Sequence, residues 1–553
     1  MTLCLLSLIN ISPIAAALAH KLDFKDLKHL ILVSHAFHDN LIPYMYQLPL
    51  QLSHPPVLSD ALAGIERYGG YLGDFWLSSW VPANCREQLK EALGRHCRRL
   101  RVLHLDVTHS EIASSALGSV VSLTRNNAGS LVELMIEVKQ PRKKPRLKEA
   151  WPLRFIENCR HLAVLRLTNC SLRTQPITLD TVLAFGRCCP NLVELEIQGL
   201  KFLSRTDVHG SSLQVVANHS SAVCSSSSSN MAVAFLFLEN LSLGETDDNV
   251  LVPLVQHCPS LTSISFEEVI CSSRVDLLVQ TLARTCGCGK LKSFALKRNP
   301  FDKLDKELAQ FDMERMLKGI ARDFYRLESI DLIGFDVSEE LLLTIAAFVG
   351  PRLTKLSICD SRSISAEGVA ALLTQCPHLR NVCFSLEQNY RRGCNDVPMD
   401  PQVIFREPWA CSATLERFTC PIGFRGGAEP EDMIYGAPGH RALERKVCAQ
   451  LGRLLQIRHL DLSVAKFRYG LFGATQVYGF SWTLERGLDQ LSGLQKLIYI
   501  NFGLAHTELG LDELVWMKQH WPWLYLIHVM DAQGTLRDWM NENWPSVVLT
   551  YSR

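Results

Sequence analysis

The chain repeats one short pattern of apolar positions along most of its length. An apolar residue is followed by two variable residues, a second apolar residue, one variable residue and a third apolar residue. The clearest copies are Leu162-Leu165-Leu167, Leu192-Leu195-Ile197 and Leu353-Leu356-Ile358. Further copies begin at Leu72, Leu100, Leu131, Leu238, Leu261, Leu291, Leu327, Leu379, Leu415, Ile457, Leu494 and Leu524. Because apolar and variable residues alternate, each copy predicts a strand with one buried face.

Cysteine shares the frame of this pattern. Six copies carry a cysteine three places before their first apolar residue, at Cys97, Cys159, Cys189, Cys258, Cys288 and Cys376. Proline follows three of these cysteines and disfavours a helical conformation in the residue before it. Upstream, Leu251, Leu254 and Val255 show helical spacing. Each unit is therefore predicted to run strand, loop, amphipathic helix and turn, and such units bury their apolar faces only by stacking.

The repeats resemble a known class. Residues 353–384 resemble the cysteine-containing subclass of leucine-rich repeats, and they read LTKLSICDSRSISAEGVAALLTQCPHLRNVCF. Most steps between copies lie near the about 20–29 residues of leucine-rich repeats or a little above. The resemblance implies an α/β fold, a leucine-rich-repeat solenoid with the form of a right-handed α/β horseshoe, over residues 60–553.

The N-terminal segment resembles an F-box. Residues 12–43 are similar to the F-box of fungal F-box/leucine-rich-repeat proteins, a group that also carries a Trp-x-x-x-x-Trp-Pro tail like those ending at Pro522 and Pro545. The resemblance implies a small all-α module over residues 1–50. Its family-matching, adaptor-binding positions would be Pro13, Ile14, Leu18, Leu22, Leu27, Leu32, Val33 and Phe37.

The resemblance implies a role in the ubiquitin conjugation pathway. The chain would be the substrate-recognition subunit of an SCF-type cullin-RING ubiquitin ligase, in which the F-box docks the adaptor subunit of the cullin complex and the concave face of the solenoid binds a target protein. Two alternatives stay open. Ser12-Pro13 and Ala15-Ala16-Ala17 replace the Leu-Pro and acidic stretch of ordinary F-boxes, which leaves room for an interaction scaffold without ligase association. A secreted leucine-rich-repeat binding protein is the other.

The third, fifth and seventh residues of each pattern are predicted to point to the concave face, because strand side chains alternate. This places the candidate partner-binding residues at Asp106, Glu133, Glu137, Arg166, Glu194, Glu196, Glu267, Asp331 and Lys355. The first part of this set is acidic, with Arg166 as its only basic member. We therefore expect the target to present a basic segment.

Composition and motifs argue against other classes of function. The net charge of +1 and pI of about 7.5 give no overall field that would favour nucleic acid or an anionic membrane. The sequence holds no His-Glu-x-x-His, phosphate-binding Walker loop or Gly-x-Ser-x-Gly. Cys286 and Cys288 are separated by one residue and lack a second pair at zinc-site spacing. We expect a non-enzymatic protein without metal or cofactor.

Cysteine usage bears on localisation. The chain has 19 cysteines, an odd count in a long chain, which favours reduced thiols and a cytoplasmic or nuclear setting. Residues 1–19 are apolar and end in Ala17-Leu18-Ala19, like a signal peptide, but no Lys or Arg precedes the apolar run. The run is also shorter than the about 20 residues of a membrane span.

Four segments depart from the repeat and are predicted to be flexible insertions, near residues 139–150, 201–234, 388–411 and 421–441. The second contains a serine run at residues 225–229, which is interpreted as a linker with a regulatory loop as the alternative. Residues 139–148 hold six Lys or Arg, and a solvated loop is favoured over a nuclear localisation signal.

Overall fold

The structure of the protein is a computed structural model. The chain forms two compact units, residues 1–262 (unit 1) and 263–553 (unit 2). The described residues are 50–52, 58–78, 81–108, 117–139, 156, 159–168, 178–202, 235–270, 275–286, 290–297, 306–361, 364–385, 399–425, 438–462, 477–478, 480–502, 509–529 and 534–551. The predicted adaptor-binding positions between Pro13 and Phe37 lie outside them, as do Cys288, residues 140–150 and residues 203–234.

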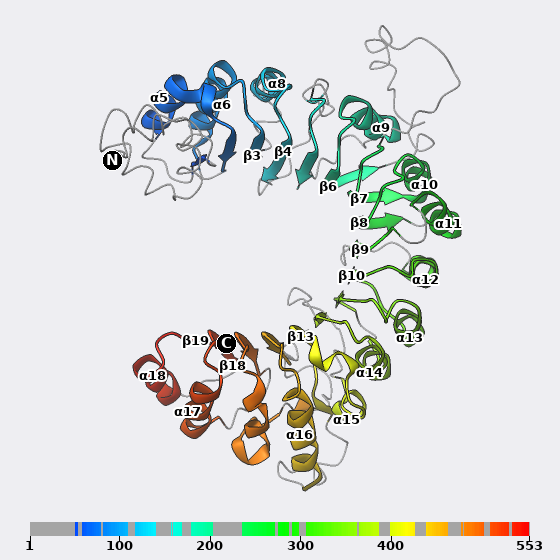
Figure 1. Cartoon of the computed structure of the whole chain (residues 1–553), viewed down its shortest axis with the longest axis vertical. Helices are drawn as coiled ribbons and strands as arrows, with labels where there is room; N and C mark the ends of the chain where they lie inside the picture. Colours follow the sequence, from blue (N-terminus) through cyan, green and yellow to red (C-terminus); the bar gives the residue numbers. More distant parts are fainter. Residues whose placement is uncertain are drawn as a thin grey trace, which may run out of the picture. The chain divides into compact units, whose positions relative to one another are not determined.

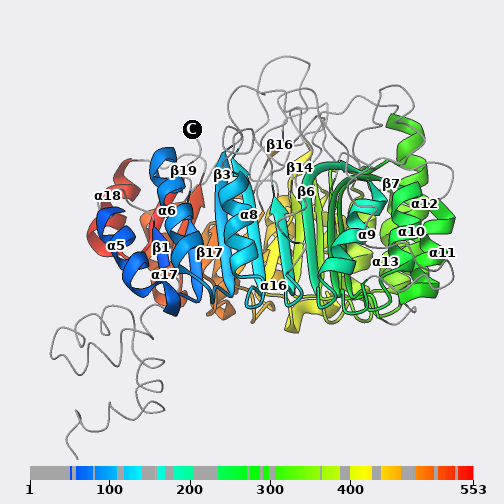
Figure 2. The ribbon, with the colours of Figure 1, turned by 90° about the horizontal axis from the view of Figure 1, so that it is seen from above.

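Unit 1 contains one parallel sheet whose strands follow one another in chain order. Its strands are β1 (Leu50–Leu52), β2 (Asp74–Leu77), β3 (Val102–Thr108), β4 (Glu133–Lys139), β5 (Val164–Thr168), β6 (Glu194–Phe202) and β7 (Asn240–Asp247). Its helices are α5 (Leu58–Tyr68), η2 (Gly69–Tyr71), α6 (Ala83–His96), α8 (Leu117–Asn126), α9 (Leu179–Cys188) and α10 (Asp248–Gln256). These helices lie along one face of the sheet (Figures 1 and 2).

Unit 2 repeats this arrangement. The parallel strands are β8 (Ser263–Ile270), β9 (Ser293–Lys297), β10 (Ser329–Ile333), β11 (Lys355–Cys359), β12 (Asn381–Ser385), β13 (Arg417–Thr419), β15 (His459–Asp461), β17 (Tyr499–Asn501), β18 (Leu526–Val529) and β19 (Val548–Tyr551). A separate antiparallel pair joins β14 (Phe424–Arg425) to β16 (Val477–Tyr478).

The helices of unit 2 lie on the outer side of its strand layer (Figure 1). They are α11 (Val275–Cys286), α12 (Lys306–Asp323), α13 (Glu339–Phe348), α14 (Ala366–Gln375), α15 (Pro401–Ile404), η5 (Ala410–Ala413), α16 (Pro438–Leu451), η6 (Leu484–Arg486), η7 (Leu488–Gly493), α17 (Leu511–His520) and α18 (Gly534–Asn543). The prediction of an α/β leucine-rich-repeat solenoid is confirmed, since strands that are consecutive in the sequence are parallel neighbours and the helices cover one face.

The apolar triad of each repeat forms the core between the sheet and the helices. Leu162, Leu165 and Leu167 are at most 1% exposed. In the sheet Leu165 pairs with Leu134 on one side and Leu195 on the other, so the triads stack from repeat to repeat. Burying each such side chain contributes roughly 1.5–3 kcal/mol, which no repeat obtains alone.

A recurrent pair of backbone hydrogen bonds sets the register between repeats. The N–H groups of Val132 and Glu133, the second and third residues of their pattern, both donate to the carbonyl of Arg101, the second residue of the preceding one (2.8 and 2.9 Å). Thr354 and Lys355 donate in the same way to Glu328 in unit 2 (2.8 and 3.0 Å). The contact involves only the strand start, so it recurs whatever the length of the intervening loop and helix.

This contact corrects one predicted register. Ile498 and Tyr499 both donate to the Arg458 carbonyl (2.8 and 3.0 Å), which makes Leu497 and not Leu494 the first residue of that copy. The apolar spacing alone was ambiguous, because the pattern fits a start at either leucine. Leu494 and Leu497 are both fully buried. The pattern also missed β1 and β19, which join the sheet although neither carries a full copy.

The described framed cysteines are buried, and Cys97, Cys189 and Cys376 are the C-cap residues of α6, α9 and α14. Cys97, Cys159, Cys189, Cys258 and Cys376 each have 0% exposed area. The N–H of Cys189 donates to the Phe185 carbonyl (2.8 Å), and the Cys189 carbonyl accepts from Leu192 N–H (3.1 Å). The predicted helix, cysteine and strand order is thus explained by one small residue that belongs to both the last helical turn and the turn before the strand.

In the repeat that begins at Leu131, Asn127 has the corresponding role one position earlier, four residues before the first apolar residue. Its side chain is 1% exposed and its amide donates to the carbonyls of Cys97 (3.2 Å) and Leu123 (2.9 Å). Its Oδ1 accepts from Leu100 N–H (2.9 Å). Asn127 therefore ties its own helix to the preceding repeat.

Two predicted insertions differ in part from expectation. The segment near 421–441 contains β14 and the start of α16, and its Ile422 is buried. Residues 399–411 of the segment near 388–411 pack into unit 2: Met399 forms a β-bridge to Ile422, and Phe405 and Trp409 are buried. The Gly- and Pro-rich composition suggested a loop, but apolar residues at these positions fill the layer beside α14 and α16. The remainder, residues 388–398, lies outside the described residues.

Replacing Asn127 by alanine should lower the free energy of unfolding by about 2–4 kcal/mol, because it removes three hydrogen bonds and leaves buried backbone groups unpaired. Urea denaturation measures the change. The matched control is Asn191→Ala, which removes one exposed hydrogen bond to the Arg160 carbonyl (3.1 Å) of the preceding repeat and should cost under about 1 kcal/mol. Equal small losses in the two variants would contradict the role of Asn127.

Candidate functional site

The candidate site is the face of the sheet opposite the helices, formed by the third, fifth and seventh residues of each pattern and called here the strand face. On β4 the side chains of Glu133, Met135 and Glu137 are half-buried, whereas Leu134 and Ile136 between them are buried. The same alternation occurs on β5 and, in unit 2, on β9, β10 and β12. The predicted orientation of these residues is confirmed, and their role in binding a partner stays a prediction.

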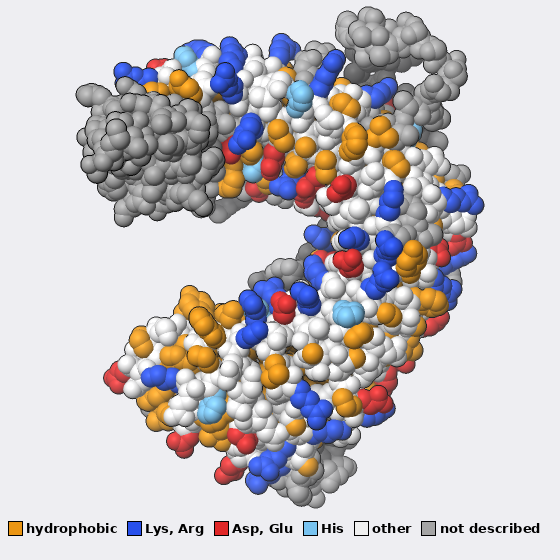
Figure 3. Space-filling model, viewed as in Figure 1, with side chains coloured by type: hydrophobic (Ala, Val, Ile, Leu, Met, Phe, Trp, Pro, Cys, Tyr) orange, Lys and Arg blue, Asp and Glu red, His pale blue; other side chains and the backbone are white. Residues whose placement is uncertain are grey.

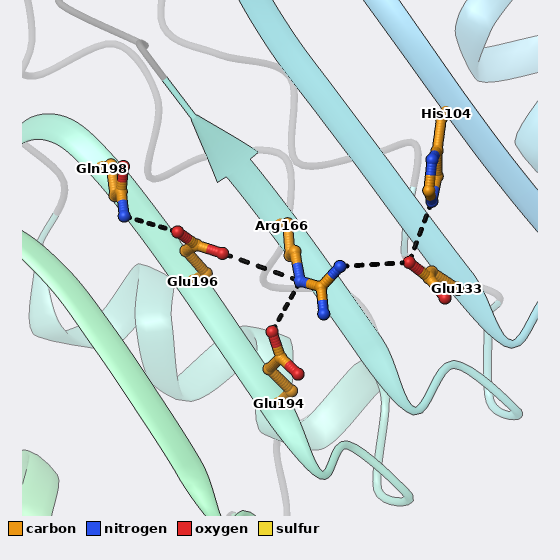
Figure 4. Close-up of polar contacts among 6 residues, drawn as sticks. All are labelled: His104, Glu133, Arg166, Glu194, Glu196 and Gln198. Carbon is orange, nitrogen blue, oxygen red and sulfur yellow. Dashed lines mark hydrogen bonds and ion pairs between the residues drawn. The ribbon is translucent and has the colours of Figure 1, made fainter. Parts of the chain in front are cut away.

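Arg166 on β5 is the centre of a charge cluster in unit 1 (Figure 4). Its Nε lies 2.6 Å from Glu194 Oε1 and 3.6 Å from Glu196 Oε2, both on β6. Its guanidinium also lies 3.3 Å from Glu133 Oε1 on β4. The strand register explains this convergence, because Arg166 pairs with Met135 and Glu196 while Glu133 and Glu194 lie diagonally across from it.

The cluster continues toward the N-terminal strands of unit 1. His104 Nε2 lies 2.9 Å from Glu133 Oε1 (Figure 4). The His104 ring stacks on Trp76 of β2, with centroids 4.9 Å apart and planes at 20°. Trp76 remains 38% exposed, so it offers an aromatic surface beside carboxylates.

Asp74 lies on the same strand as Trp76 and carries an unusual carboxylate. Its Oδ1 is buried without a hydrogen-bond partner, and Arg101 approaches it only to 3.7 Å. Burial raises the pKa of Asp74, Arg101 and His104 oppose that shift, and Glu133 adds to it.

Negative charge exceeds positive charge on the strand face of unit 1. We define the acidic face as Asp74, Asp106, Glu133, Glu137, Glu194 and Glu196. Arg101 pairs with Asp74, and Arg166 pairs with Glu133, Glu194 and Glu196; the hydrogen bond with Glu194 raises the pKa of Arg166. Figure 3 shows acidic side chains along the strand side of unit 1. At the third, fifth and seventh positions of β2 to β6 the described residues include six carboxylates and one guanidinium, that of Arg166, so acidic residues predominate there.

The remaining predicted residues lie on the strand face of unit 2. Glu267 is on β8, Asp331 on β10 and Lys355 on β11. Lys355 Nζ approaches Asp331 Oδ2 to 3.7 Å, and their strands are neighbours. The structure therefore brings six of the nine predicted partner-binding residues together in unit 1 and pairs two others in unit 2.

Sequence reasoning missed a row of basic side chains at the strand starts of unit 2. The row consists of Lys292, Arg380, Arg417 and Arg458, all exposed, and Lys and Arg side chains are visible on this side in Figure 3. Lys292 pairs with Glu328 (3.6 Å) and Arg380 with Glu416 (3.7 Å). Three of the four occupy the second position of the pattern, so examining that position together with the third would have found them.

Two features are absent from the described residues. No group of three or more His, Cys, Asp and Glu side chains in the described part of the chain is arranged to hold a metal ion. Among the helices that the structure describes, none is both long and apolar enough to cross a membrane. The chemistry of the described strand face is that of charge pairing, aromatic stacking and hydrogen bonding, which are means of recognition.

Comparisons with known proteins concern the fold. No protein-family model matches the chain, and no curated protein sequence matches it. Among solved structures, a leucine-rich-repeat protein of Leptospira interrogans is 13% identical, with a TM-score of 0.37 and coverage of 91% of this chain and 100% of that one. The yeast Rad7 and Elc1 complex is 13% identical, with a TM-score of 0.40 and coverage of 90% and 93%. The TLR13–ssRNA13 complex is 14% identical, with a TM-score of 0.40 and coverage of 91% and 58%. TM-scores of this size add no argument to what the strands and helices show.

Replacing Arg166 by glutamine should lower the free energy of unfolding by about 1–2 kcal/mol at low salt, because Glu133, Glu194 and Glu196 lose their shared cation and repel one another. Added salt should reduce this loss by screening the repulsion. Urea denaturation at two salt concentrations measures both effects. The control is Arg95→Gln, which breaks an exposed pair with Glu91 one helical turn away and should change stability by about 0.5 kcal/mol at most. A loss in the Arg166 variant that salt does not alter would contradict this account.

Proposed function

We propose that this chain is the substrate-recognition subunit of an SCF-type cullin-RING ubiquitin ligase. Residues 1–50 would dock on the adaptor subunit, and the strand face would hold a target protein. The observation that carries the recognition half of this proposal is the strand face of unit 1, where β2 to β6 present an acidic and aromatic surface on a rigid parallel sheet. The adaptor half is supported by the F-box resemblance of residues 12–43.

The acidic face favours a target with a basic segment. A Lys or Arg side chain of the target would pair with carboxylates such as Asp74 and Glu133 while stacking on the exposed ring of Trp76. Complementary charge of this kind speeds association and selects partners more than it adds affinity. The expected target is therefore a protein whose basic segment lies in an exposed, extended stretch.

The proposed contribution to ubiquitin transfer is proximity. Holding the target next to the ubiquitin-loaded subunits raises its effective concentration, which requires no bond chemistry from this chain. The setting proposed for this role is the cytoplasm, the nucleus or both. A scaffold with the same strand face but no adaptor contact is the second candidate, and the departures at Ser12-Pro13 and Ala15-Ala16-Ala17 favour it.

Charge reversal tests the recognition half. The double variant Glu133→Lys and Glu194→Lys should reduce capture of the target by about tenfold or more, because it replaces attraction of a basic segment by repulsion. The matched control is Glu91→Lys with Asp180→Lys, an equal change of charge at exposed positions on α6 and α9. Quantitative mass spectrometry of captured proteins gives the readout. An unchanged set of partners in the Glu133 and Glu194 variant would exclude the acidic face as the binding surface.

Affinity capture with and without residues 1–46 tests the adaptor half. The full chain should retain the adaptor, the cullin and the target, whereas the truncated chain should keep only the target. A full-length variant with Leu22→Asp and Leu27→Asp should behave like the truncation, since an adaptor-docking surface is apolar. If the full chain captures target without adaptor, the scaffold and not the ligase subunit is the correct function.

A further inference from the structure

Two thiols lie on neighbouring strands of the strand face of unit 2. Cys359 is the last residue of β11, and Cys383 is the middle residue of β12. In the register between these strands Cys359 pairs with Ser385, and Ser357 pairs with Cys383. Both cysteines are half-buried, in contrast to the framed cysteines on the helix side of the sheet.

Hydrogen-bond donors converge on the sulfur of Cys359. The hydroxyl of Ser385 donates to Cys359 Sγ at 3.1 Å, and Ser357 Oγ lies 3.5 Å from the same sulfur. The thiol of Cys383 also hydrogen-bonds to it. Donors of this kind favour the charged form of a thiol, which is the nucleophilic form.

The backbone holds Cys359 at a sharp turn. The next residue, Asp360, has a left-handed conformation with φ of 58°, and its N–H donates to the Ser385 carbonyl (2.8 Å). Gly334 has the same conformation (φ of 80°) at the equivalent position of the preceding repeat. Asp360 accepts a conformation that favours glycine, and the bond to Ser385 fixes the end of β11 against β12.

The pKa values of the two thiols shift in opposite directions. Hydrogen bonding from Cys383 is the largest cause that lowers the pKa of Cys359 to about 6, against the opposing effects of burial and Asp331. The same contact with Cys359 raises the pKa of Cys383. The titratable groups facing Cys359 are Asp331 on β10 and Cys383 on β12, and Lys355 on β11 pairs with Asp331. By contrast, burial raises the pKa of Cys97 and of Cys376 to about 12.

We propose that Cys359 is a thiol-modification site that takes small disulfides, such as glutathione disulfide, by thiol–disulfide exchange. The Cys359 thiolate attacks one sulfur of the disulfide, a new S–S bond forms to Cys359, and the bond between the two original sulfurs breaks. The leaving glutathione thiolate takes the electron pair and is protonated by solvent, so electrons and atoms balance without a further oxidant. The adduct would cover part of the strand face of unit 2. This proposal does not rest on the proposed ligase function.

Cys383 acts in this site as a donor and not as a resolving thiol. Cys383 lies diagonally across from Cys359 in the register between β11 and β12. Since strands lie about 4.8 Å apart and rise about 3.3 Å per residue, the Cα atoms of such a pair are about 8 Å apart. A disulfide requires about 7 Å or less. The mixed disulfide on Cys359 therefore persists until an external thiol removes it.

The first test treats the full chain with glutathione disulfide at pH 6 and follows each cysteine by peptide mass spectrometry. About half of Cys359 is thiolate there, against under about 1% of an ordinary thiol. The lower intrinsic reactivity of a low-pKa thiolate offsets part of this gain. Cys359 should thus react about tenfold faster than the half-exposed Cys85 and Cys188. Cys359→Ser should remove its adduct, and the control Cys188→Ser should not change the rate at Cys359. Equal rates at Cys359, Cys85 and Cys188 would overturn the proposal.

The second test measures the pH profile of alkylation at Cys359 by iodoacetamide. The rate in the native chain should be half-maximal near pH 6, and Ser385→Ala or Cys383→Ala should each move this midpoint to higher pH. Above about pH 9, where ordinary thiols are ionised, both variants should react at least as fast as the native chain, because a thiolate of higher pKa is more nucleophilic. This separates loss of a donor from loss of the fold. Midpoints that do not move, or an internal Cys359–Cys383 disulfide in the exchange experiment, would overturn the assigned roles.

Discussion

The structure depends on the way in which each repeat is tied to the one before it. Two N–H groups at the start of a strand share one carbonyl of the preceding strand, as Val132 and Glu133 share that of Arg101. This contact places the buried apolar residues of adjacent repeats side by side, and their burial supplies the stability that a single repeat lacks. The segment between the strands varies from repeat to repeat. The α-helix α12 spans 18 residues, whereas a later repeat has the short 3-10 helix η7 in its place.

Because the apolar core occupies the helix side, the strand face is available for function. The helix side is filled by leucines and by framed cysteines, and burial keeps the latter protonated, as the pKa of about 11 for Cys159 illustrates. On the strand face the same strands carry side chains that no triad constrains. There the register brings together residues about 30 positions apart in sequence, such as His104 with Glu133 (2.9 Å) and Arg166 with Glu194 (2.6 Å).

Buried polar groups in this molecule are of two kinds, those that are paired and those that are not. Asn127 and the Glu444–Arg486 pair, 3.3 Å apart with side chains 4% and 10% exposed, join elements where the repeat is irregular. Asp74 on the strand face, by contrast, leaves an oxygen without a hydrogen-bond partner. The former connect neighbouring elements through hydrogen bonds and charge pairing and so stabilise the fold. The latter is an acceptor without a hydrogen-bond partner on the strand that also carries the exposed Trp76.

The sequence by itself determined the repeat, its α/β character, the buried triads, the cysteine frame and the side chains of the strand face, because all of these follow from a local period of apolar residues. It did not determine the register at Leu497, the packing of residues 399–411 or the strands β1 and β19, since local patterns there were ambiguous or incomplete. Nor did it show that Arg166 holds three glutamates or that Cys359 and Cys383 are neighbours. Those facts depend on lateral pairing between strands, and pairing is decided by how whole repeats stack and not by any segment alone.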